Sequence, residues 1–225
     1  MTITFIGHGY VGLVTAAVFA DLGNTVWVVG HTPEKIANLR KGISPFYEPG
    51  LEEMIKHNLE AGRLLFTLDY GEAVKDSKII FICVGTPSKT NGEADLSSVF
   101  AAAKEIGKNL KSYAVIATKS TVPIGTNRKV AQIIRKIAGK KLTFDIASCP
   151  EFLKEGSAIA DTQNPDRIVI GAESEKAREL LLDLHKPIDG ERIITGIETA
   201  EMIKYASNAL LAAKISFANA ISFIS

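Results

Sequence analysis

The feature that most constrains the fold lies at the start of the chain, where an apolar β-type run leads into a glycine-rich turn. Residues 7–12 read Gly-His-Gly-Tyr-Val-Gly, and a helical pattern over residues 11–22 follows. Gly7 allows a sharp turn, Gly9 lets the backbone approach a pyrophosphate, and Gly12 lets the helix pack closely against the strand. The free N–H groups of the first helical turn would then face phosphate groups. The motif alone is compatible with a tight turn, but between a strand and a helix it predicts nucleotide binding.

Short β-branched runs alternate with helical periodicity along most of the chain. We expect strands at residues 3–6, 25–29, 64–68, 79–84, 114–117, 144–148, 167–170 and 192–194. We expect helices at residues 11–22, 33–40, 51–60, 72–75, 96–110, 126–138 and 174–185. This alternation indicates a parallel sheet covered on both faces, with two βαβαβ halves up to about residue 150. The predicted fold class is α/β, a Rossmann-like doubly wound parallel sheet that binds ligands at the carboxyl ends of its strands.

The last stretch, residues 199–225, contains no glycine or proline and predicts the start of one long helix, apolar over most of its circumference. Lys204, Asn208, Lys214 and Asn219 would be costly in hydrocarbon, so we expect burial between domains or subunits rather than a membrane span. We therefore divide the chain into a dinucleotide-binding domain at residues 1–198 and the start of a central helix.

Charge and cysteine usage exclude several classes of protein. A formal net charge of +1 provides no field that would attract nucleic acid or an anionic membrane. The two cysteines lack motif spacing, so we expect neither a disulfide framework nor a metal site. Cys83 lies in an apolar run and is interpreted as a core residue, whereas Cys149, before Pro150, is expected to be exposed. The N-terminal residues do not resemble a signal peptide, and we expect a cytoplasmic location.

Seven short segments, which include three loops at predicted strand ends, follow one another along the chain. They are Gly-His-Gly-Tyr-Val-Gly at 7–12, Tyr-Glu-Pro-Gly-Leu at 47–51, Val-Gly-Thr-Pro at 84–87, Ser-Thr-Val-Pro-Ile-Gly-Thr at 120–126, Pro-Glu-Phe-Leu-Lys-Glu-Gly at 150–156, Pro-Asp-Arg-Ile-Val-Ile-Gly at 165–171, and Glu201, Lys204, Asn208 and Lys214 on the last helix. Together they resemble the UDP-glucose/GDP-mannose dehydrogenase family of nucleotide-sugar dehydrogenases, and the resemblance covers essentially the whole chain.

The resemblance implies oxidation of a sugar C6 alcohol to a carboxylate in two NAD-linked hydride steps, with UDP-glucose becoming UDP-glucuronate. In the family a cysteine captures the aldehyde, and water hydrolyses the resulting thioester. The family also assembles as a homodimer through its central helix. Two alternatives remain open: a dehydrogenase for UDP-N-acetylmannosamine or GDP-mannose, and a stand-alone dinucleotide-binding module.

Four residues match catalytic positions of the family. Glu151 matches the general base of the hydrolysis, and Thr121 matches a residue near the nicotinamide and an ordered water. Lys204 and Asn208 match the pair that stabilises the developing oxyanion, and their spacing of four places them on one helical face.

Two further sets match binding positions. The segment from Glu151 to Glu155 matches a sugar-binding loop, and Glu155 matches a residue that lines both cofactor and substrate. The substrate-binding candidates are Glu151, Phe152, Leu153, Lys154, Glu155, Lys204 and Asn208. The cofactor-binding candidates are Gly7, Gly9, Tyr10, Val11, Gly12, Gly30, His31, Thr32, Lys35, Thr86, Thr121 and Glu155.

The sequence departs from the family at the end of its second strand. An acidic residue is expected there to bind the adenosine ribose hydroxyls, but the chain has Gly30. Glu34 is near in sequence but lies inside the next predicted helix. With His31, Thr32 and Lys35 close by, we hypothesise a weakened NAD site, with tolerance of NADP as the alternative.

A second departure concerns the nucleophile. The family's reactive cysteine and its partner aspartate lie beyond the long helix, in a nucleotide-sugar domain that these 225 residues do not contain. Neither Cys83 nor Cys149 matches it. We expect the chain to bind a dinucleotide but not to oxidise UDP-glucose alone.

Overall fold

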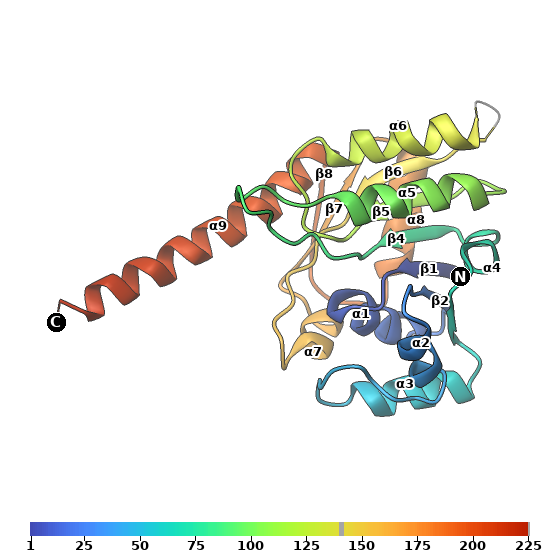
Figure 1. Ribbon diagram of the computed structural model, residues 1–225, viewed down its shortest axis with the longest axis horizontal. Coiled ribbons are helices and arrows are strands. Elements are labelled where there is room, and N and C mark those ends of the chain that lie inside the picture. Colours follow the sequence, from blue (N-terminus) through green and yellow to red (C-terminus); the bar gives the residue numbers. More distant parts are fainter. Residues whose placement is uncertain (140–141, 225) are drawn as a thin grey trace.

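In the computed structural model, which describes residues 1–139 and 142–224, eight strands form one sheet (Figure 1). They are β1 (Thr2–Ile6), β2 (Thr25–Val29), β3 (Leu64–Thr67), β4 (Ile79–Ile82), β5 (Val115–Thr118), β6 (Asp145–Ser148), β7 (Arg167–Ala172) and β8 (Glu191–Thr195). Their order in the sheet is β3-β2-β1-β4-β5-β6-β7-β8. The first six strands are parallel to one another. The chain adds β2 and β3 on one side of β1 and then β4, β5 and β6 on the other side, so the strand order reverses between β1 and β4. The predicted doubly wound fold is therefore confirmed, with its ligand crevice expected at that reversal.

Helices cover both faces of the sheet. They are α1 (Tyr10–Asp21), α2 (Pro33–Leu39), α3 (Leu51–Glu60), α4 (Tyr70–Val74), α5 (Ser97–Asn109), α6 (Thr126–Ala138), α7 (Ala158–Gln163), α8 (Glu175–His185) and α9 (Ile197–Ser222). Alternate strand residues point to opposite faces, so Phe5 and Phe81 pack with α1 and α3 while Ile80 and Ile116 pack with α5 and α6. Burial on both sides explains why these strands are continuously apolar in sequence.

The sheet departs from the expected parallel arrangement at β7, which pairs with β6 in the antiparallel direction. Only Ala147 and Ser148 of β6 pair with Ala172 and Gly171, so β7 begins beyond the carboxyl end of β6. The connection between the two strands consequently stays at the ligand edge of the sheet instead of crossing a face. It contains α7, a short helix that the sequence reading missed because its apolar residues are too few to show a helical period.

A second correction concerns Cys149, which was expected to be exposed at a strand end. Its residue is only 2% exposed because the antiparallel β7 and the chain after Pro150 cover the end of β6. The expectation for Cys83 is confirmed, since it is buried against the glycine turn.

The long helix α9 begins at Ile197, two residues earlier than expected, because Gly196 takes the extended conformation of an N-cap. Its first turns are buried at Ile197, Ala200, Glu201 and Lys204, and the remainder extends away from the body of the molecule (Figure 1). Within the described residues no helix is both long enough and apolar enough to cross a membrane.

Glu201 anchors α9 to the start of α6. Its carboxylate accepts hydrogen bonds from the Gly125 N–H at 2.6 Å, the Asn127 N–H at 2.9 Å and the Asn127 side-chain amide at 2.8 Å. Glu201 is 2% exposed, so these three donors replace the water that its charge loses on burial. The sequence indicates only that Glu201 belongs to a family pattern, and the structure shows that it anchors α9 to α6.

We predict that Glu201→Gln lowers the free energy of unfolding by about 2 kcal/mol, because an amide cannot accept from all three donors and leaves one of them buried and unpaired. Urea unfolding of the two proteins measures the difference. The control is Glu198→Gln one turn earlier, where the carboxylate pairs with Arg128 near the surface and its loss is expected to cost less than about 1 kcal/mol. Equal losses in the two variants would contradict this role for Glu201.

Candidate functional site

The glycine turn has the geometry of a phosphate cradle. Gly7 has φ +116°, and a Cβ there would lie 2.5 Å from the Cys83 carbonyl oxygen. A Cβ on Gly12 would collide with the Gly7 carbonyl oxygen, so both positions require glycine for backbone approach. Gly9 is different, because nothing lies within 4 Å of its Cβ position. Gly9 is the N-cap of the twelve-residue α1 and supplies no side-chain cap, so the first helical N–H groups remain available to a ligand. These residues fit a dinucleotide pyrophosphate.

Glu48 connects this turn to the loop after β6. Its carboxylate accepts a short hydrogen bond from the Tyr10 hydroxyl and another from the Gly156 N–H at 2.8 Å. The Gly156 N–H also donates to the Tyr10 oxygen at 2.9 Å, so the three groups form a closed triangle. Glu48 is 5% exposed. The Tyr-Glu-Pro-Gly segment therefore positions the glycine turn against the loop that precedes α7.

The two ionisable members of this triangle respond to burial and to each other. Burial, followed by the hydrogen bond to Glu48, raises the pKa of Tyr10 to about 12. Burial also opposes ionisation of Glu48, but hydrogen bonds from Tyr10 and from three backbone N–H groups outweigh it and lower the pKa of that carboxyl. The negative charge of Glu155 makes a smaller contribution that also raises the pKa of Tyr10.

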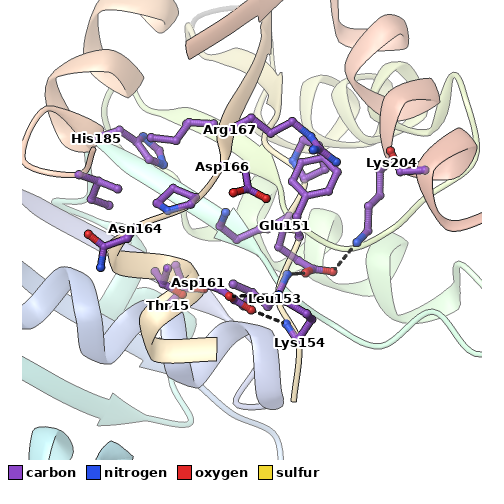
Figure 2. A pocket seen from close by; sticks show the side chains of 18 of the residues that line it. Thr15, Glu151, Leu153, Lys154, Asp161, Asn164, Asp166, Arg167, His185 and Lys204 are labelled. Atoms are coloured by element: carbon purple, nitrogen blue, oxygen red, sulfur yellow. Dashed lines mark hydrogen bonds and ion pairs between the residues drawn. The ribbon is translucent and has the colours of Figure 1, made fainter. Parts of the chain in front are cut away.

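A pocket of about 370 Å³ lies on the other side of the same loop, and we call it the Glu151 pocket. Figure 2 shows Lys204 reaching from α9 toward Glu151, and the two groups are 3.0 Å apart. The Glu151 carboxylate also accepts from the Leu153 N–H at 2.6 Å. The side chains of Lys204 and Glu151 are 9% and 13% exposed, so their ion pair is largely shielded from water. Asn208, one turn further along α9, lines the same pocket.

The aromatic ring of Phe152 forms part of the pocket wall between two cations. The Arg167 guanidinium lies 4.1 Å from the ring centroid and the Lys204 ammonium 5.1 Å from it. On the opposite side of the loop, Asp161 accepts from the Lys154 N–H at 2.9 Å and pairs with the Lys154 ammonium at 3.7 Å (Figure 2). The pocket lining thus combines an aromatic ring with both cations and carboxylates, among them the shielded pair of Lys204 and Glu151.

The loops after β4 and β5 meet beside the glycine turn. The Thr86 hydroxyl donates to the Thr121 carbonyl oxygen at 2.9 Å, and the Ser120 hydroxyl donates to the Val84 carbonyl oxygen at 2.6 Å. Lys119, which the sequence reading left unassigned, is 8% exposed and donates to the Cys149 carbonyl oxygen at 3.4 Å. Lys119 lines the Glu151 pocket and carries its positive charge toward the interior.

The structure divides the sequence-derived candidates into two groups along one sheet edge. The Glu151 pocket brings together Glu151, Phe152, Leu153, Lys154, Lys204 and Asn208. Thr86 and Thr121 lie outside its lining, as do the glycine-turn residues Gly7, Gly9, Tyr10, Val11 and Gly12, the β2-end residues Gly30, His31, Thr32 and Lys35, and Glu155. Sequence reasoning missed Glu48, Lys119, Asp161 and Glu201 as site-forming residues. Glu48 and Glu201 both lie in segments that resemble the family, and this position could have indicated a role for them. No local sequence pattern indicates a role for Asp161.

Neither thiol in the chain is suited to nucleophilic attack. Burial raises the pKa of Cys83 and of Cys149 to about 12, so both remain protonated at neutral pH. Both are free cysteines that lie in the interior of the sheet.

A doubly wound sheet with a glycine turn at the end of its first strand defines a dinucleotide-binding α/β protein. Sequence comparison identifies which kind it is. The profile of the UDP-glucose/GDP-mannose dehydrogenase family, NAD binding domain, matches residues 1–189, and the profile of the central domain of the same family matches residues 198–225. The chain belongs to the UDP-glucose/GDP-mannose dehydrogenase family.

Similar proteins carry related names. The UDP-glucose 6-dehydrogenase TuaD of Bacillus subtilis is 50% identical over 222 residues, which cover 99% of this chain and 48% of the relative. The UDP-glucose 6-dehydrogenase of Pseudomonas aeruginosa is 47% identical, with 97% and 50% covered. The chain spans about half the length of the curated relatives it matches.

Solved structures agree with the sequence comparison. A UDP-glucose dehydrogenase from Pyrobaculum islandicum superposes with a TM-score of 0.95 at 44% identity, covering 98% of this chain and 52% of that one. A GDP-mannose dehydrogenase from Pseudomonas aeruginosa superposes with a TM-score of 0.93 at 39% identity, covering 97% and 52%.

His185 in the wall of the pocket leads to a prediction about pH. Burial, reinforced by the charge of Lys119, lowers the pKa of His185 from 6.5 to about 4. The unfolded chain therefore binds a proton more readily than the folded one, and stability falls as the pH drops below the unfolded value. We expect the free energy of unfolding to lose about 1 kcal/mol from this residue between about pH 7 and about pH 5.5.

The measurement is urea unfolding at both pH values for the unaltered protein and for His185→Leu, which should lack this part of the loss. Phe19→Leu is the control, because Phe19 packs edge-on against the His185 ring at 5.2 Å but does not titrate. The control should be less stable at both pH values with the pH dependence unchanged. A full pH dependence in His185→Leu would refute the assignment.

Proposed function

We propose that this chain is the dinucleotide-binding portion of an enzyme that oxidises UDP-glucose to UDP-glucuronate. Residues 1–198 are the proposed binding domain, and residues 199–225 the start of the central helix. The observation that carries the proposal is the convergence of Glu151 and Lys204, from two separate family segments, on one shielded ion pair at 3.0 Å. Among the solved structures, the UDP-glucose dehydrogenase is 44% identical and the GDP-mannose dehydrogenase 39%, which favours UDP-glucose. Oxidation of GDP-mannose or UDP-N-acetylmannosamine and a stand-alone binding module are the alternatives.

The proposed chemistry follows from the charges in the Glu151 pocket. Bound NAD would supply the hydride acceptor. The Glu151 carboxylate, 3.0 Å from the Lys204 ammonium, is proposed to accept a proton from a water molecule during hydrolysis of a thioester. The Lys204 ammonium and the Asn208 amide are placed to stabilise an oxyanion in the same pocket. Thr121 and Glu155 are proposed to contact the cofactor, because they match cofactor-side positions of the family and because Thr121 is hydrogen-bonded to Thr86, a second cofactor candidate.

The nucleophilic cysteine is proposed to lie outside these residues. Cys83 and Cys149 are both buried with raised pKa values, which supports the view that neither captures an aldehyde. The chain by itself is therefore proposed to bind cofactor without completing the oxidation.

Assembly as a homodimer through α9 is a further part of the proposal. Beyond Lys204 the helix exposes large apolar side chains, and such a surface is expected to be covered by another protein surface. They include Leu210, Leu211, Ile215, Phe217 and Ile221. The expected cytoplasmic location stays a prediction.

The proposed dinucleotide site predicts that Gly9→Ala weakens NADH binding at least tenfold, because the added methyl group enters the space left for the pyrophosphate. Its fold should be preserved, since nothing lies within 4 Å of that position. Gly196→Ala is a matched control, because Gly196 is also a helix N-cap with an open Cβ position. Fluorescence titration with NADH measures the affinities. Unchanged binding in Gly9→Ala would contradict phosphate binding at this turn.

The proposed catalysis requires a longer protein, so we suggest joining residues 1–225 to the second half of the Bacillus subtilis relative. Lys204→Met in this fusion should lower kcat by about 100-fold or more, because the ammonium proposed to stabilise the oxyanion and to position Glu151 is lost. NADH formation from UDP-glucose and NAD is the assay. Lys129→Met, at an exposed position on α6, is the control and should leave kcat unchanged.

The unfused chain should produce no NADH in the same assay. Steady turnover by the unfused chain would refute the proposed absence of the nucleophile. Full activity of the Lys204→Met fusion would refute the role given to Lys204.

A further inference from the structure

The carboxyl end of β2 is built without the acidic residue that usually binds the adenosine ribose in this fold. The residue there is Gly30, and the structure shows why no side chain replaces it. A Cβ on Gly30 would lie 2.5 Å from Cδ1 of Ile36 and 2.9 Å from Nδ1 of His8. The imidazole of His8, from the glycine turn itself, therefore occupies the space next to the ribose-binding position.

His8 is polar, buried and incompletely bonded. It is 6% exposed, and in the part of the chain that the structure describes its Nδ1 has no hydrogen-bond partner. A buried ring nitrogen without a partner is costly, so its retention calls for a ligand or another explanation. The second imidazole of the cluster is His31, whose ring centroid lies 5.1 Å from that of His8.

The surroundings of His8 are electropositive. Burial is the main reason that the pKa of His8 is lowered, and the charges of His31 and Lys35 lower it further. A site that disfavours protonation of an imidazole through neighbouring positive charge favours the binding of an anion. Between Gly30 and Lys35 the one carboxylate in the sequence is Glu34, which is exposed on α2.

We propose that His8, His31 and Lys35 bind a phosphate group on the adenosine ribose 2′-oxygen, so that the preferred dinucleotide is NADP(H) rather than NAD(H). This proposal rests on the dinucleotide site proposed above. A carboxylate at position 30 would repel a 2′-phosphate, and Gly30 removes that repulsion. His31 and Lys35 are exposed and so are free to adjust to the ligand, whereas His8 is buried, with its Nδ1 next to the Cβ position of Gly30. Thr32, half-buried in the same connection, adds a hydroxyl donor.

The test compares the dissociation constants of NADPH and NADH for the full 225-residue chain by fluorescence titration. NADPH is expected to bind about tenfold more tightly, which corresponds to about 1.4 kcal/mol. Displacement of NADH by adenosine 2′,5′-bisphosphate and by adenosine 5′-monophosphate isolates the 2′-phosphate, and the bisphosphate should compete more strongly.

Variants at exposed positions test the assigned residues without disturbing the core. His31→Ala and Lys35→Met should each weaken NADPH binding about fivefold to tenfold and change NADH binding less than about twofold. Lys129→Met, on α6 and exposed, is a matched loss of charge that should change neither affinity. The combined variant His8→Ala with Gly30→Asp removes the imidazole and introduces a carboxylate, whose Cβ still requires the end of the Ile36 side chain to shift. This variant should reverse the preference toward NADH.

The outcomes separate this proposal from the function on which it rests. Binding of neither dinucleotide would overturn the proposed function and this proposal with it. NADH binding as tight as or tighter than NADPH binding would overturn this proposal alone. If NADH binds more tightly, the variant Glu34→Gln identifies the cause. Loss of the NADH preference in this variant would show that Glu34 is the carboxylate that binds the ribose.

Discussion

The antiparallel pairing of β7 with β6 is the constraint on which the candidate site depends. Because β7 starts beyond the carboxyl end of β6, the connection from Cys149 to Asp166 stays at the edge where a doubly wound sheet binds its ligands. A parallel crossover would have carried this connection across a face of the sheet. The same register brings the end of β8 level with the end of β6, so α9 begins there and its Lys204 reaches Glu151.

Three carboxylates that are buried or largely shielded from water then join the separate segments of this edge. Glu48 binds the glycine turn to the loop before α7, Glu201 binds α9 to α6, and Glu151 pairs with α9 through Lys204. Each of these charges would be expensive in the interior without donors, and each has them. A network of this kind defines the relative positions of its segments more narrowly than apolar packing does, because hydrogen bonds require particular distances and directions.

Much of the fold and part of the site could be predicted from the sequence. Strands such as β4 are short, apolar and bounded by turn residues, and the glycine turn has a defined spacing, so both leave local signals. The direction of β7 has no such signal, because a strand has the same residue pattern in either direction. The exposure predicted for Cys149 was wrong for that reason, since its cover comes from a neighbouring strand. The role of Glu48 was missed because its partners Tyr10 and Gly156 are far away in the sequence.

The sequence by itself determined the class of fold, the glycine turn and the identity of the charged residues, because periodicity and spacing are properties of neighbouring residues along the chain. Only the tertiary structure decided which charged side chains form pairs, and which side chains occupy the space next to Gly30. Gly30 illustrates the difference. The sequence shows that position 30 lacks a carboxylate, whereas the structure shows that His8 and Ile36 occupy the space that a side chain at this position would need. Close packing excludes a second side chain from a volume that is already occupied, and that exclusion exists only in three dimensions.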